Sequence, residues 1–381
     1  MTSAAAPPSP PARTVTLLVL GAVAAALAAA LGSPMATAVI GLILFGILHN
    51  LLEIRYVVGR FPGVLGRPFL DLLVGLITGI VVCRLLVGVV GRPAQLAEVV
   101  LGYAILAVAA QRGLRGRRRH VAWGVIAVAA IASLSFPAYH FVVLTHLHNV
   151  VPLVFLWEWS RRIASRRWSR SFRAVQLLWV LVVPAVLLSG LLDGSLGTDP
   201  GIVRSVVGDG QSVLAASAPP GEAATVLGMR VLAVFAFMQT MHYVVWVALM
   251  PRVAPDASAA FESRAPWLTG PRLWAAGFVA AALFAVLFGL DFTQGKAVYA
   301  ALASYHAYLE LPVLLALLVG GAAARQATAS PGGSGAGTQT GSGRAGTAPV
   351  GGGVGGGGAG QGLDLRPETA PAVALDPEVG P

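Results

Sequence analysis

The sequence predicts an all-α integral membrane protein, a polytopic bundle of about ten transmembrane helices. The 381 residues are 56% hydrophobic and only 11% charged, whereas soluble chains carry about 25% charged residues. The apolar residues occur in runs close to the roughly 20 residues that a helix needs to cross the hydrocarbon core. The arginines lie in short clusters between these runs. A bilayer, unlike a soluble core, can accommodate this much apolar surface.

Each predicted helix is an apolar run bounded by charged or helix-breaking residues. Pro34, Pro62, Pro93, Pro137 and Pro251 fall at or near the joints between runs, where proline ends a helix. The two runs that flank Pro137 have almost no loop between them. The predicted spans are 14–32, 35–57, 69–90, 95–111, 120–136, 140–159, 174–192, 225–250, 273–292 and 297–320.

The basic residues predict the orientation of these helices. With the N-terminus in the cytoplasm, most arginines fall in cytoplasmic loops, and the outer loops hold only Arg92, Arg204 and Lys296. This alternation follows the positive-inside rule and places both termini in the cytoplasm, with the bundle in the cell inner (plasma) membrane. The first run could instead be a signal peptide, whose cleavage would leave nine helices in the same orientation.

The chain divides into a membrane domain and two polar ends. Residues 1–13 are predicted to be a disordered N-terminus, and residues 14–320 the transmembrane domain, with its longest outer loop at 194–224. Residues 321–381 are rich in glycine, alanine and proline, a composition that stays disordered. The net charge of +10 does not indicate nucleic-acid binding, because the arginines do not gather on one polar face. With Cys83 as the only cysteine, disulfides and multi-thiolate metal sites are excluded within one chain.

Ionisable side chains at membrane depth are costly and therefore mark functional sites. Histidines and glutamates occur on the predicted second, sixth, eighth and tenth helices, which all run from outside to inside. Counted back from the inner helix ends, His49, His148, His242 and Glu310 fall roughly 15–20 Å above those ends, which predicts one shared site. The candidate metal ligands are His49, Glu53, His146, His148, His242, His306 and Glu310.

The spacing of these residues refines the candidate site. His49 with Glu53, and His306 with Glu310, are i, i+4 pairs on one helix face. In such a pair the carboxylate can bind a metal beside the imidazole or orient it. His146 and His148 point apart on a regular helix, so only one is expected in a common site. His146 is favoured because Asn149 follows it on the same face.

A less specific interpretation applies to each residue taken alone. A single membrane histidine usually makes an interhelical hydrogen bond. Glu53 could likewise pair with Arg55 or Arg112 near the cytoplasmic surface. A shared site is favoured because several such groups share one level on four helices.

Imidazole and carboxylate without thiolate suit iron, zinc or manganese. The sequence therefore favours a metal-dependent membrane enzyme that acts on a lipid-soluble small molecule among the membrane lipids. Iron would imply oxidation of the substrate, which is favoured, and zinc would imply hydrolysis by an activated water. Such chemistry resembles, in general terms, that of membrane desaturases and hydroxylases. Their clustered His-x-x-His-His boxes are absent from this sequence, so no residue is assigned by analogy.

Two other classes of function remain open. The His/Glu layer could relay protons in a proton-coupled transporter, although inverted repeats and matching broken helices are not evident. Four histidines could also supply the axial ligands of haem in an electron-transfer protein. Haem is less favoured, because its pockets rarely need carboxylates one turn from the ligand and there is no Cys-x-x-Cys-His attachment site.

Overall fold

The structure, a computed structural model, describes residues 10–319, and within this range every regular element is a helix. Nine helical segments in this range are long and apolar enough to cross a membrane, which confirms the all-α membrane bundle. The predictions for residues 1–9 and 320–381 lie outside the described residues. The nine segments are α1 (Ala12–Gly32), α2 (Pro34–Arg60), α3 (Phe69–Val90), α4 (Arg92–Gly113), α6 and α7 (Pro137–Val150, Pro152–Ser160), α8 and α9 (Arg166–Leu177, Val183–Ser189), α12 and α13 (Val226–Tyr243, Met250–Val253), α15 (Gly270–Leu290), and α16 and α17 (Phe292–Leu309, Leu311–Leu318).

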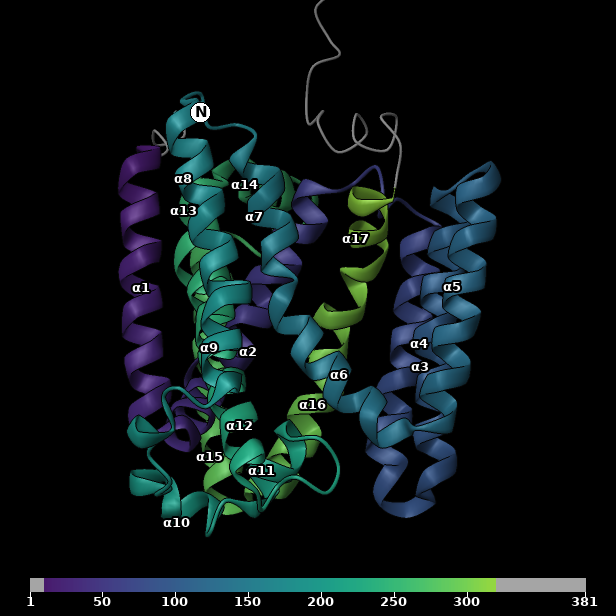
Figure 1. Cartoon of the computed structure of the whole chain (residues 1–381). Coiled ribbons are helices and arrows are strands. Elements are labelled where there is room, and N and C mark those ends of the chain that lie inside the picture. Colours follow the sequence, from purple (N-terminus) through teal and green to yellow (C-terminus); the bar gives the residue numbers. More distant parts are fainter. Residues whose placement is uncertain (1–9, 320–381) are drawn as a thin grey trace, which may run out of the picture. The chain divides into compact units, whose positions relative to one another are not determined.

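Helix α5 (Gly116–Ser135) corresponds to the predicted fifth span but is not among these nine. Three arginines at its start, Arg117 to Arg119, reduce its apolar length. None of its residues is buried, and it lies alongside α4 (Figure 1). The structure thus gives nine spans in the part that it describes, and a tenth through α5 stays a prediction. Only Phe136 separates α5 from α6, as the absence of a loop at Pro137 predicted.

The connections between helices alternate between two ends of the bundle (Figure 1). The connections α4–α5, α7–α8 and α13–α15 lie at one end, called here the arginine-rich end, because most arginines of the described residues lie in these connections or in the helix ends beside them. The connections α3–α4 and α9–α12 lie at the opposite end. This is the alternation that the positive-inside pattern predicted, and the identification of the arginine-rich end with the cytoplasm stays a prediction. The predicted outer loop is folded, and it includes α10 (Arg204–Val207) and α11 (Gln211–Ser217).

The helices that carry the intramembrane histidines form the centre of the bundle. Helix α2 packs against α12, α15 and α16, and α12 also packs against α6. The spans α2, α12–α13 and α16–α17 are the most buried of the nine, with half or more of their most apolar stretch inside the protein. The remaining spans bury much less of theirs, so they present most of their surface to lipid. The candidate site therefore lies in the best-packed part of the bundle.

Three of these four helices are irregular beside a candidate residue. Pro152 has no N–H to donate to the carbonyl of His148, which instead accepts from the N–H of Val151 at 3.1 Å. Glu310 separates α16 from α17, two residues before Pro312. A π-helical segment, Val244–Leu249, follows the end of α12 just after His242. Such segments recur at functional sites, because they re-aim side chains within a helix.

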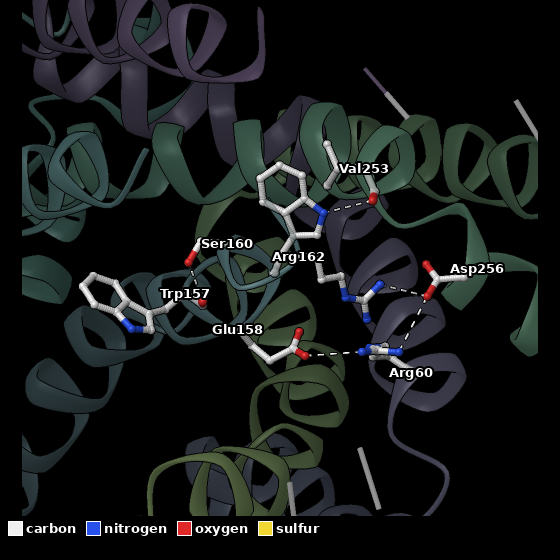
Figure 2. Close-up of polar contacts among 8 residues, drawn as sticks. Arg60, Trp157, Glu158, Ser160, Arg162, Val253 and Asp256 are labelled. Carbon is white, nitrogen blue, oxygen red and sulfur yellow. Dashed lines mark hydrogen bonds and ion pairs between the residues drawn. The ribbon is translucent and has the colours of Figure 1, made fainter. Parts of the chain in front are cut away.

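An ion-pair network joins the helices at the arginine-rich end (Figure 2). Arg60, at the end of α2, lies 3.3 Å from Glu158 of α7 and 3.6 Å from Asp256. Asp256 belongs to α14 (Pro255–Arg264) and also pairs with Arg162 at 3.0 Å. Because the Arg60 side chain is only 4% exposed, the network fixes α14 and α7 against the end of the central helix.

Gly59 provides a test of this packing. A Cβ atom at Gly59 would collide with the backbone carbonyl of Ala257 in α14, whereas one at Gly75 of α3 would meet nothing within 4 Å. Gly59→Ala is therefore expected to destabilise the protein by about 1–3 kcal/mol through overpacking. Thermal unfolding in detergent measures the effect, with Gly75→Ala as the matched control. Equal melting temperatures for the two variants would contradict the close approach of α14 to α2.

Candidate metal centre

The structure brings five of the predicted residues together at one point in the centre of the bundle. These are His49 and Glu53 of α2, His148 of α6, His242 of α12 and His306 of α16. One potential ligand atom from each lies within 4.8 Å of the corresponding atoms of the other four. The predicted convergence of four helices at one level is confirmed. The binding of a metal by these groups stays a prediction.

The four imidazoles form a closed circuit in which each ring contacts two others. The ring centroids are 5.0 Å apart for His49 and His242, and 4.6 Å for His242 and His148. His148 and His306 are 4.7 Å apart, and His306 and His49 are 4.9 Å apart. The carboxylate of Glu53 lies beside the ring of His242, with its Oε2 3.5 Å from Nε2 of His242. The circuit therefore gathers donor atoms from four helices around a single small volume.

Hydrogen bonds fix which nitrogen of two histidines faces this volume. Nδ1 of His49 lies 3.0 Å from the carbonyl of Phe45, to which only a protonated nitrogen can donate. Nδ1 of His148 lies 2.9 Å from Oε1 of Glu310, and a carboxylate accepts that proton. In both rings Nε2 is then left with a free lone pair. A metal-bound histidine typically shows this arrangement, with its other nitrogen donating to a carbonyl or carboxylate.

The distance between two of the inward-facing nitrogens also suits a metal. Nε2 of His148 and Nε2 of His306 are 2.9 Å apart. Two nitrogens bound to one ion at about 2.0–2.1 Å and at right angles would stand about 3 Å apart. A hydrogen bond from one ring to the other gives a similar separation. The geometry therefore accommodates either a shared ion or a proton between the rings.

The cluster contains buried polar atoms that no hydrogen bond among the described residues satisfies. Both ring nitrogens of His242 and both carboxylate oxygens of Glu53 are in this state. Glu53 is fully buried, and His242 is 1% exposed. Leaving one such group unsatisfied costs about 1–3 kcal/mol, and more for a charged group. A bound ligand would remove this cost, which is concentrated in one cluster.

The remaining two predicted residues lie outside the cluster. Glu310 is not one of the five clustered residues, but its Oε1 lies 2.9 Å from Nδ1 of His148 and accepts that proton. His146 points toward the opposite end of the bundle, where its Nε2 lies 2.8 Å from the carbonyl of Ser217 in α11. The preference for His146 over His148 was therefore wrong. This hydrogen bond joins α6 to a segment about 70 residues further along the chain, and sequence spacing gives no sign of it.

Two cavities meet at the cluster. The smaller, of about 270 Å³, is lined by the four histidines and extends toward α11. The larger, of about 870 Å³, is mainly apolar and is lined by α4, α5, α6 and α17. His148 lines both cavities, and its side chain is 17% exposed. Phe136, Val143 and Leu147, which line the larger cavity, are more than half exposed, so this cavity opens on the surface that faces lipid.

Several residues around the histidines were not singled out from the sequence. The ring of Tyr243 lies 4.6 Å from that of His49. Asn50, which is 3% exposed, has an amide without a hydrogen-bond partner among the described residues. Lys296, predicted to lie in an outer loop, instead belongs to α16 and lines the smaller cavity. The Asp291 side chain, which caps α16 by accepting from the N–H of Gln294, marks the true helix start.

The chain matches no protein-family model, no curated protein and no solved structure. The site alone therefore carries the argument for function.

Proposed function

We propose that the protein is a membrane-embedded, metal-dependent oxidoreductase that acts on a lipid-soluble substrate. The observation that carries this proposal is the convergence of four imidazoles and one carboxylate on a buried point beside an apolar cavity. His49, His148, His242, His306 and Glu53 would hold the ion, and Glu310 would orient His148. The donor set, with nitrogen and oxygen but no sulfur, suits iron, zinc or manganese.

The surroundings of the cluster favour iron and oxidation over zinc and hydrolysis. Hydrolysis needs a water supply, but the larger cavity is lined almost wholly by apolar and aromatic residues. Dioxygen and apolar molecules both enter such a cavity readily from lipid. Iron would supply one-electron and oxygen chemistry there. The protein's own part would be to hold the donors, exclude water and align the substrate against the histidines.

Haem fits the same residues less well. The four ring centroids stand 4.6–5.0 Å from their neighbours, closer than two imidazoles on opposite faces of one haem can stand. The rings also contact one another directly, without a slot for a planar macrocycle.

Metal analysis of the purified protein, together with its optical spectrum, tests the proposal. We expect about one iron per chain and no Soret band. A folded protein that holds no stoichiometric metal would contradict the proposal. Zinc in place of iron would move the assignment from oxidation to hydrolysis.

A proton-coupled transporter is the second candidate, because two buried carboxylates, Glu53 and Glu310, lie within the histidine layer. Groups of this kind can relay protons across a membrane. Proteoliposomes that carry a pH gradient distinguish the two functions. Proton flux without a bound metal would favour the transporter.

A further inference from the structure

The smaller cavity has an unusual charge. Among its lining residues in the described part of the chain are two fixed cations, Arg84 and Lys296, and no carboxylate. Arg84 is compensated, since its guanidinium lies 2.6 Å from Glu98 of α4 and also donates to the carbonyl of Ala300. Lys296 has no ion pair among the described residues, and the only aromatic contact of its Nζ there is the Phe292 ring, 6.0 Å away. The positive charge of Lys296 is therefore the one charge in the lining of this cavity that no carboxylate among the described residues balances.

The Lys296 side chain lies at one end of the smaller cavity, far from the histidine cluster. It lies four residues after the start of α16, about 6 Å into the helix. This is the end of the bundle where α11 covers the cavity, since Val213 and Ser217 are among the lining residues. His306 lies ten residues further along the same helix, about 15 Å away. The cavity thus has a cation near one membrane surface and the histidine cluster at its inner end.

An ammonium group taken out of water without a partner costs several kcal/mol. An anionic ligand would remove that cost, and the remaining walls are suited to an apolar chain. Val39, Leu42, Leu144 and Phe235 line the cavity between its two ends. A span of about 15 Å corresponds to an extended chain of about 12 carbon atoms.

We propose that the smaller cavity binds an elongated apolar molecule by an anionic head group, such as a carboxylate, held against Lys296. The chain of the molecule then lies along α6 and α12 and reaches the four histidines about 15 Å away. As a substrate class, this assignment rests on the proposed oxidative function of the centre. The binding of the acid itself does not depend on a metal.

The test compares dodecanoate with dodecan-1-ol, which has the same chain and a neutral head group. Binding of each radiolabelled compound to the full-length protein in lipid nanodiscs is measured by equilibrium dialysis, with empty nanodiscs as background. We expect the wild-type protein to bind dodecanoate at least about tenfold more tightly than the alcohol, the ratio that one moderate ionic contact provides. Acetate, which lacks the chain, should not displace dodecanoate.

Substitutions at Lys296 locate the contact. Lys296→Met should abolish the preference for the acid, and Lys296→Arg should keep most of it. Arg204→Met is the matched control, because Arg204 is an exposed cation at the same end that pairs with Asp199. Unchanged metal content and circular dichroism establish that each variant folds.

Three outcomes would overturn the inference: equal affinity of the wild-type protein for acid and alcohol, a preference that survives in Lys296→Met, or full competition by acetate. These failures are distinct from failure of the proposed function. A protein that holds iron but shows no preference for the acid loses only the substrate class. A protein that prefers the acid but holds no metal loses only the oxidative function.

Discussion

Replacing His242 with alanine is expected to remove the metal from the purified protein. His242 lies between His49 and His148 in the circuit of rings, and neither of its nitrogens makes a hydrogen bond among the described residues. Loss of a direct ligand should lower the metal affinity by more than the 10–100-fold that follows loss of an outer partner. Elemental analysis after dialysis against a chelator measures this, and His306→Ala should behave alike.

The sequence offers a matched control on α6. His146 is also a histidine and lies two positions before His148. Its side chain hydrogen-bonds to α11 and does not face the cluster. His146→Ala should therefore retain wild-type metal content. If His242→Ala and His306→Ala also retain it, the cluster is not a metal centre. If His146→Ala alone loses the metal, the orientation of α6 is wrong.

The second large effect is expected at Glu310, which contacts His148 but is not one of the five clustered residues. Its carboxylate accepts from Nδ1 of His148 and so holds Nε2 toward the other rings. Glu310→Leu removes this acceptor and should weaken metal binding by about 10–100-fold. Glu310→Gln retains a carbonyl oxygen that can accept the same proton, so its effect should be several-fold smaller. Chelator competition at fixed pH ranks the two variants.

Glu262→Gln is a suitable control for this series. Glu262 is a carboxylate outside the cluster that pairs with Arg55 at the arginine-rich end. The Glu262→Gln substitution should leave the metal affinity unchanged, whatever its effect on the stability of the protein. Equal affinities for the Gln and Leu variants at position 310 would show that Glu310 does not orient His148.

Hydrophobic length and arginine placement were sufficient to predict the membrane bundle, because both respond to the bilayer and not to a particular partner. The common depth of His49, His148 and His242 could be predicted for the same reason. A polar group at mid-membrane is costly unless other polar groups meet it, and groups at one level are available to do so. The i, i+4 relation of His49 and Glu53 holds because α2 is regular across both residues.

The features that the sequence did not predict depend on contacts between distant segments. Glu98, near the start of α4, is 2% exposed and pairs with Arg84 of the neighbouring helix, a contact that the sequence does not indicate. The choice between His146 and His148 depended on a carbonyl in α11, far along the chain. Lys296 was placed in a loop because polar residues precede it, although Asp291 caps a helix there. Periodicity carries no information about such partners.

The clustered residues are far apart in the sequence, so they become available one after another while the chain is synthesised. The five clustered residues are distributed from position 49 to position 306, and Glu310 follows. During synthesis the eight described spans that precede α16 can enter the membrane while the cluster still lacks its contribution from α16. All five potential ligands are therefore present only after almost the whole membrane domain has been inserted. The final turn of α6, tightened ahead of Pro152, would keep His148 aimed at a place that only the last span completes. A chain that ends before α16 therefore lacks His306 and cannot complete the cluster.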